Sequence, residues 1–152
     1  MYNICFFTEE ITFQIPYADL LSIWIKDCIQ ASGKRLIQLN YIFCDDAYLL
    51  KLNKGYLHHD YFTDVLTFNY GDGVDEIEGD VYISIERVEE HVDVFGSTFY
   101  EELCRVLIHA VLHLVGYDDK TPEERGRMCV LEDAWLAKPI LQGYLSRVYD
   151  GL

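Results

Sequence analysis

The chain has 152 residues, 51% of them hydrophobic and 25% charged, which suits a single domain over residues 1–152 with one hydrophobic core. This composition excludes intrinsic disorder, which combines low hydrophobicity with high charge, and no apolar run reaches the roughly 18 residues of a membrane-spanning helix. The net charge of −14 argues against DNA binding and broad nucleic-acid binding, which need a basic face.

The start of the chain and its cysteines indicate the compartment. Residues 1–10 lack the basic start and long apolar stretch of a targeting signal. The five cysteines are odd in number, have no CxxC spacing and mostly lie in apolar runs, so reduced thiols fit better than a disulfide framework. We therefore expect a soluble cytoplasmic protein that contacts no membrane.

The first half of the chain alternates between strand and helix patterns. Residues 2–7 form a short β-type run, and residues 16–31 have apolar side chains at helical spacing. Residues 36–44 alternate like a strand, and Asp45 is placed to cap a helix that runs to about residue 55. Residues 58–63 are expected to form a loop.

The middle of the chain has the pattern of a β-hairpin followed by a helix. Residues 64–70 and 80–85 predict two strands, joined by an acidic, glycine-containing loop over residues 71–78. Residues 86–95 predict a helix that ends at Gly96.

Helices dominate the last third. The longest is expected over residues 98–115, with Thr98 as cap and Glu101 at the capping-box position. After a turn at residues 116–120, Thr121 and Glu124 repeat the capping-box pattern and open a helix to about residue 137. The last dozen residues predict one more short helix. Together these elements predict an α+β (mixed α/β) fold, with a central four-stranded mixed sheet covered by about five to six helices.

The stretch from His109 to Asp119 carries the candidate chemistry. His109 and His113 are four residues apart, so they share one face of the helix and can converge on one metal ion. Gly116 can end the helix in a left-handed conformation and return the chain, so that Asp119 supplies a third ligand. Two nitrogens and one oxygen suit a Zn²⁺ ion, with other divalent transition metals as alternatives, and a fourth position left for water is typical of a catalytic site.

The histidine pair alone is a modest signal, because chance gives about 0.16 such pairs in a chain of this composition. The surrounding helix is apolar on nearly every side, which predicts that it is buried. Buried imidazoles without partners cost about 1–3 kcal/mol each, and one metal satisfies both, although backbone carbonyls could do the same. Metallopeptidases carry a glutamate directly after the first histidine, and Ala110 occupies that position here, which argues against peptide hydrolysis.

The same stretch resembles the bacterial endoribonuclease YbeY family of rRNA maturation factors, whose hallmark runs His-Gly-x-Leu-His-Leu-x-Gly-Tyr-Asp-His. Two upstream segments resemble the family as well and follow in the same order. The matching residues are Leu52, Asn53, Tyr56, Thr63, Asp64, Val65, Leu66, Phe68, Gly79, Asp80, Val81, Ile83, Ser84, His109, Leu112, His113, Leu114, Gly116, Tyr117 and Asp118.

The resemblance implies a zinc-dependent, single-strand-specific endoribonuclease that acts in 16S rRNA 3′-end maturation and in quality control of the small ribosomal subunit. Its partners would be single-stranded RNA, including rRNA, and small ribosomal subunit proteins. The resemblance also implies a zincin-like metal helix with ligands at His109, His113 and Asp119. No catalytic residue beyond these ligands is assigned, and the RNA is expected to enter a basic cleft beside the metal.

Three positions depart from the family pattern. Asp119 stands where most members have histidine, and Ala110 replaces the hallmark glycine. Leu57 occupies the position of an arginine that is thought to act in RNA cleavage, and leucine cannot hold a phosphate. Lys54, His58 or His59 is a candidate replacement, against the alternative that these residues form a solvated helix end and loop.

Two further features leave alternatives open. Asp64 could orient a ligand histidine, or could simply begin a strand. The acidic run over residues 72–80 is read as a solvated loop rather than a metal site. The alternative function is a non-catalytic ribosome-assembly factor whose metal is mainly structural, which Leu57 and the net charge of −14 favour.

Overall fold

In the computed structural model, which describes residues 3–57, 65–72 and 74–150, four strands form one mixed sheet. Its order is β1-β2-β4-β3, with β1 and β4 parallel to β2 and with β3 antiparallel to β4. The strands are β1 (Ile4–Thr8), β2 (Arg35–Cys44), β3 (Val65–Asn69) and β4 (Glu76–Ser84). The α+β class and the mixed four-stranded sheet are thus confirmed.

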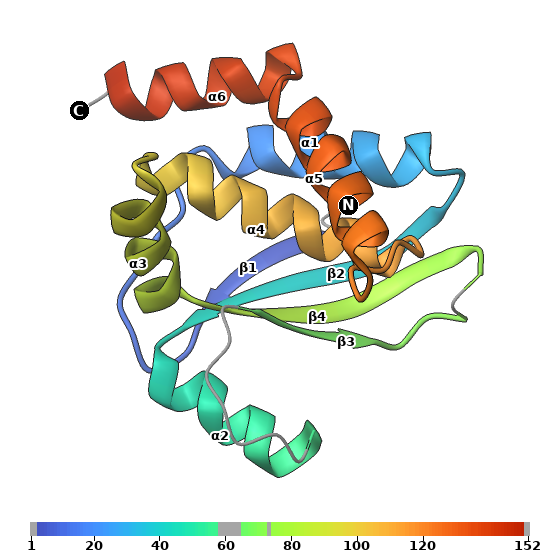
Figure 1. The fold of residues 1–152 in the computed structure, drawn as a ribbon, viewed down its shortest axis with the longest axis horizontal. Coiled ribbons are helices and arrows are strands. Elements are labelled where there is room, and N and C mark those ends of the chain that lie inside the picture. The colour runs from blue at the N-terminus through green and yellow to red at the C-terminus, as the bar shows by residue number, and fades with distance from the viewer. Residues whose placement is uncertain (1–2, 58–64, 73, 151–152) are drawn as a thin grey trace.

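Six helices within the described ranges surround this sheet. They are α1 (Ala18–Ala31), α2 (Asp46–Leu57), α3 (Ile85–Phe95), α4 (Phe99–Leu114), α5 (Pro122–Leu136) and α6 (Pro139–Asp150). In Figure 1, α1, α4, α5 and α6 lie on one side of the sheet and α2 on the other, with α3 at one end. Helix α4 is therefore enclosed between the sheet and the outer helices.

Alternation along β2 explains the main core. Leu39, Tyr41 and Phe43 are at most 1% exposed and belong to the main core cluster, since every second residue of a strand faces the same side. Cys44 and Leu49 belong instead to a smaller buried cluster with Leu66. The sheet thus has apolar contacts on both faces, with the larger core on the side of α4.

Two hydrogen bonds from buried aromatic side chains join elements far apart in the sequence. The Tyr41 hydroxyl in β2 donates to the Leu107 carbonyl oxygen in α4 at 3.0 Å. The Trp24 indole in α1 donates to the Trp135 carbonyl oxygen in α5 at 2.9 Å. Buried Tyr and Trp polar groups usually find such partners, and these two fix α4 and α5, which carry the candidate site.

Strand β4 begins four residues earlier than predicted, at Glu76. Glu76 and Glu78 made this segment look like an acidic loop, but Ile77 between them is 2% exposed and the segment pairs in parallel with β2. The period-2 pattern therefore holds, with carboxylates outward and isoleucine inward, because pairing and burial override local composition.

The acidic turn before β4 is organised by Asp72. Its Oδ1 accepts backbone N–H bonds from Val74, Asp75 and Glu76 at 2.9–3.0 Å. These hydrogen bonds, that from Val74 foremost, lower the pKa of the exposed Asp72 carboxyl group. The carboxylate thus serves as a turn acceptor.

The predicted capping box at the start of α4 is wrong. Thr98 has an extended backbone but no side-chain capping bond. Glu102, rather than Glu101, is the buried glutamate of this turn, and it accepts a 2.6 Å hydrogen bond from the Ser97 hydroxyl. The second predicted box, between Thr121 and Glu124 at the start of α5, is confirmed.

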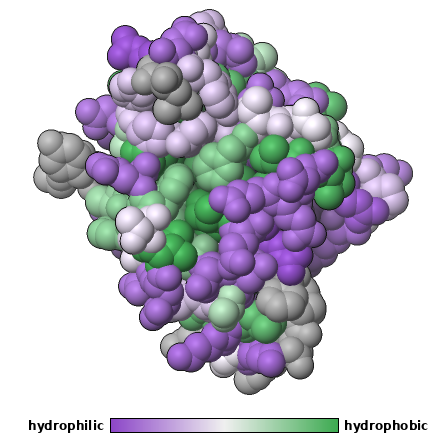
Figure 2. Space-filling model, turned by 90° about the vertical axis from the view of Figure 1, so that its left-hand side faces the viewer, coloured by the Kyte–Doolittle hydropathy of each residue, from purple (hydrophilic) through white to green (hydrophobic). Residues whose placement is uncertain are grey.

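One side of the molecule carries apolar surface beside α3. Val94 and Phe95, at the end of that helix, are 67% and 69% exposed. Figure 2 views the molecule from this side and shows hydrophobic surface in a band next to a broad hydrophilic area. None of the helices in the described residues is long and apolar enough to span a membrane.

Candidate metal centre

His109 and His113 project from the one open stripe of α4. Most residues of this helix are buried, whereas the two histidine side chains are 24% and 27% exposed. The prediction of a buried helix is right, but its two imidazoles are half-buried, and that of His109 borders a pocket. Their ring centroids lie 4.5 Å apart, as expected for residues four apart on one helix face.

The chain returns to this face through Gly116, which has φ 118°, a value that favours glycine. The Gly116 amide donates to the His113 carbonyl oxygen at 3.1 Å, and the Tyr117 amide donates to the Leu112 carbonyl oxygen at 2.9 Å. These bonds close the end of α4, and the capping box at Thr121 starts α5 immediately afterwards. Asp119 is thereby held between two fixed helix ends.

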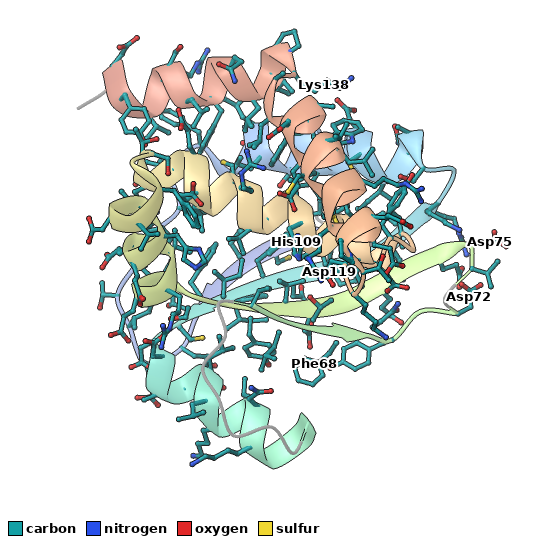
Figure 3. The ribbon with its side chains drawn as sticks, viewed as in Figure 1. Phe68, Asp72, Asp75, His109, Asp119 and Lys138 are labelled. Atoms are coloured by element: carbon teal, nitrogen blue, oxygen red, sulfur yellow. The ribbon has the colours of Figure 1, made fainter. Side chains whose placement is uncertain are left out.

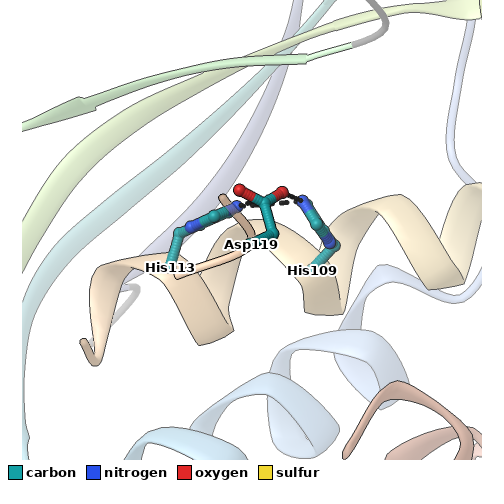
Figure 4. A group of neighbouring side chains, drawn as sticks. All are labelled: His109, His113 and Asp119. Atoms are coloured by element: carbon teal, nitrogen blue, oxygen red, sulfur yellow. Dashed lines mark hydrogen bonds and ion pairs between the residues drawn. The ribbon is translucent and has the colours of Figure 1, made fainter. Parts of the chain in front are cut away.

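The three candidate ligands meet at one point (Figure 4). His113 Nε2 lies 3.0 Å from His109 Nε2 and 3.2 Å from Asp119 Oδ2, and His109 Nε2 lies 3.4 Å from the same carboxylate oxygen. A tetrahedral zinc ion with bonds of about 2.0–2.1 Å would separate its ligand atoms by about 3.3–3.4 Å. The side chains therefore fit a small metal ion, and within the described residues they are the one cluster of this kind.

Glu132 in α5 is part of the site and was missed by sequence reasoning. Its Oε2 lies 2.6 Å from His109 Nδ1, and its Oε1 accepts a 2.9 Å bond from Arg105 Nη1. Because a carboxylate only accepts hydrogen bonds, the Nδ1 of His109 carries the proton, and in the neutral ring Nε2 offers a lone pair. That lone pair faces His113 and Asp119, which suits a cation.

A sequence signal for Glu132 exists in α5. The glutamate follows Met128 by four residues, so both occupy the same helix face, and they are 5% and 2% exposed. A glutamate on an apolar helix face is rarely buried without a partner. The sequence could indicate that Glu132 has a partner, but not that the partner is His109.

The other predicted site residues fall partly outside the described part of the chain. His58, His59, Asp64 and the side chain of Leu57 lie outside the described residues. Lys54 is exposed on α2 and does not line the pocket beside the cluster. In Figure 3, His109 and Asp119 lie together near α4 and α5, whereas Asp72 and Asp75 lie at the far end of the β3–β4 hairpin, which agrees with reading the acidic run as a loop.

A pocket of about 290 Å³ adjoins the cluster and includes His109 and Asp119 in its wall. Its cationic side chains are Arg105 and Arg125, and they are balanced by the carboxylates of Glu102, Glu132 and Asp119. The other lining residues are Phe95, Val106, Met128, Cys129 and His91. The lining is thus of mixed charge, and among the residues described the strongly basic cleft expected from sequence is not found here.

Arg125 lies at the rim of this pocket, next to the cluster. Its Nη1 donates to the carbonyl oxygens of Lys120 and Asp119 at 3.0 and 3.4 Å. Arg105, by contrast, forms ion pairs with Glu132 and Asp133 at 2.9 and 2.7 Å. The guanidinium of Arg125 is therefore an exposed cation that lies both beside Asp119 and in the pocket wall.

Comparisons with known proteins show the family of the chain. The family model described as "Endoribonuclease YbeY" matches residues 6–139. The chain is 49% identical over 127 residues to an "Endoribonuclease YbeY" of Flavobacterium psychrophilum, covering 84% of this chain and 90% of that protein. It is 43% identical over 134 residues to one of Amoebophilus asiaticus, covering 88% and 91%.

Among solved structures, the fold is similar to the solution structure of TM1509 from Thermotoga maritima. The TM-score is 0.67, with 24% sequence identity over 95% of this chain and 93% of the other. This likeness supports the fold of the chain.

Proposed function

Because the chain belongs to the endoribonuclease YbeY family, we propose that it is a zinc-dependent, single-strand-specific endoribonuclease that matures the 16S rRNA 3′ end and takes part in quality control of the small ribosomal subunit. Family membership gives the endoribonuclease role and the RNA substrate. The observation that carries metal dependence is the convergence of His109, His113 and Asp119, whose ligand atoms lie within 4.8 Å of one another.

In this proposal the two imidazoles and the carboxylate hold the metal, and Glu132 holds His109. When bound, the ion supplies Lewis acidity toward a phosphodiester. Three protein ligands within the described residues leave coordination positions for substrate and water, which is typical of catalytic rather than structural zinc sites. The partial exposure of both histidines supports access from the pocket.

The adjoining pocket is the proposed place of the RNA segment next to the cleaved bond. Phe95 and His91 offer aromatic surface, with ring centroids 5.8 Å apart, and unpaired bases stack on such side chains. Arg125 at the rim can contact a phosphate, a role that Leu57 cannot perform. In this proposal a base stacks in the pocket, and a base is free to do so only where the RNA is unpaired. This stacking supports specificity for single-stranded RNA.

We extend the proposal to the whole chain as one cytoplasmic domain with small ribosomal subunit proteins as partners. The family match over residues 6–139 supports one unit. The acidic net charge of −14 favours contacts with basic ribosomal proteins over unspecific contacts with nucleic acid.

The alternative function is a non-catalytic assembly factor with a mainly structural metal. It is favoured by the mixed charge of the pocket and by leucine at position 57. The two functions differ in one respect that can be measured, namely hydrolysis of RNA.

The test is cleavage of a labelled single-stranded RNA by the full chain loaded with zinc. A duplex of the same sequence, a chelator-treated sample and a His113→Ala variant run beside it, with Asp118→Asn as a control for an exposed neighbour of the cluster. We expect cleavage of the single strand by wild type and Asp118→Asn only, and its return when zinc is restored after chelation. Inactive wild-type protein that carries one zinc per chain would reject the enzyme and favour the assembly factor.

A further inference from the structure

We propose that Glu132, braced by Arg105, is a positioning residue that fixes the tautomer and ring orientation of His109 for the metal. This inference rests on the proposed function, because it assumes that His109 is a ligand. It adds to that site Glu132 from α5 and Arg105 from α4, neither of which the sequence indicated.

Both oxygens of the Glu132 carboxylate have assigned contacts. Oε2 lies 2.6 Å from His109 Nδ1, and Oε1 lies 2.9 Å from Arg105 Nη1. The side chain is only 7% exposed, and a buried carboxylate is stable only when it is paired. The contacts therefore direct Oε2 of this carboxylate at the far side of the histidine ring.

Arg105 lies on α4, four residues before His109, and spans two neighbouring carboxylates of α5. Its Nη1 bonds Glu132 and its Nη2 bonds Asp133 at 2.7 Å. The planar guanidinium fixes the direction of both bonds. The ion pair between Arg105 and Asp133 already joins α4 to α5. The contact between Glu132 and His109 is therefore not needed to join the two helices.

The contact with Glu132 determines which nitrogen of His109 can bind the metal. With a proton held on Nδ1, His109 presents the Nε2 lone pair to the point where His113 Nε2 and Asp119 Oδ2 meet, 3.0 and 3.4 Å away. Histidine ligands in metal sites commonly donate their other N–H to a carboxylate, and loss of that partner lowers metal affinity by about 10–100-fold. The structure assigns this partner to Glu132.

The experiment measures zinc affinity by competition with a chromophoric chelator for four forms of the full chain. These are wild type, Glu132→Gln, Glu132→Ala and Asp133→Asn. Glu132→Gln keeps the volume of the side chain but removes its charge, and Asp133→Asn removes the charge of the other partner of Arg105 without changing a contact of His109. Thermal melting of the zinc-free proteins shows whether each variant is folded.

We expect the dissociation constant for zinc to rise about 10–100-fold in both Glu132 variants and to change less than about twofold in Asp133→Asn. In zinc-free protein, ¹⁵N NMR of the imidazole should show the Nδ1–H tautomer of His109 in wild type and a mixture of tautomers in Glu132→Gln. A merely structural carboxylate would alter melting but not the tautomer.

Failure of the positioning role can be distinguished from failure of the proposed function. Unchanged zinc affinity and an unchanged tautomer in folded Glu132→Gln would overturn the positioning role while leaving the proposed function intact. Wild-type protein that binds no zinc would overturn both.

Discussion

Asp119 would give the candidate metal centre a negative charge that a third histidine would not supply. Its Oδ2 lies 3.2 Å from His113 Nε2 and 3.4 Å from His109 Nε2, so the three atoms can share one ion. A carboxylate is a harder ligand than imidazole and remains acceptable to zinc. The neighbouring Asp118 has the same chemistry but is exposed and lies outside the cluster.

This contrast predicts the effect of single amide substitutions. Asp119→Asn should weaken zinc binding by more than about 100-fold, since even the loss of an outer partner costs about 10–100-fold, whereas Asp118→Asn should bind like wild type. Isothermal titration with zinc measures both. Equal affinities for the two variants would remove Asp119 from the ligand set.

At the scale of elements, Gly79 allows strands β3 and β4 to approach beside the end of α4. A Cβ at this position would lie 2.6 Å from the Phe68 carbonyl oxygen and 3.4 Å from Leu114 Cδ2. The first distance is too short for a real contact, so any side chain would push the hairpin apart. Gly143 in α6, by contrast, has no such neighbour within 4 Å.

The two glycines should therefore respond in opposite directions to alanine. Gly79→Ala should lower the free energy of unfolding by about 1–3 kcal/mol, as overpacking does. Gly143→Ala should raise it by about 0.5–1 kcal/mol, because glycine inside a helix is unfavourable. Urea denaturation measures both, and a destabilised Gly143→Ala together with an unaffected Gly79→Ala would contradict the packing described.

The sequence predicts elements well where local pattern and tertiary packing agree. The strand pattern of β2 is readable because Leu39, Tyr41 and Phe43 occupy every second position of a β-rich run, and Gly116 correctly marks the return toward Asp119. The start of β4 was missed because its carboxylates resemble a loop until Ile77 is seen to be buried. Glu132 was missed because its contact with His109 spans 23 positions and depends on how α4 and α5 pack.

At the scale of the whole molecule, the five cysteines differ in burial. Cys28, Cys44 and Cys104 are fully buried, Cys5 is half-buried and Cys129 is exposed. Burial raises the pKa of the Cys28 and Cys44 thiols to about 12 and also raises that of Cys104. Since alkylation requires the thiolate, the folded protein should protect these three residues.

Iodoacetamide at pH 8, followed by peptide mass spectrometry, should label Cys129 first and the three buried thiols only after unfolding.

The raised pKa values also determine the direction in which the stability of the fold changes with pH. The thiols stabilise the fold fully below their unfolded pKa of about 8.5, and this contribution is lost as the pH rises toward the folded value of about 12. Rapid labelling of Cys28 by iodoacetamide in the native protein would contradict the burial of this thiol in the core.

The proposed function depends on a three-ligand metal centre that two histidines and one carboxylate form and that is open to substrate. X-ray absorption spectroscopy of the full chain loaded with one zinc measures it most directly. We expect nitrogen and oxygen scatterers at about 2.0–2.1 Å, two of them from imidazoles, and no sulfur. A sulfur scatterer at about 2.3 Å or a third imidazole would contradict it, because either would mean that a different set of residues holds the ion.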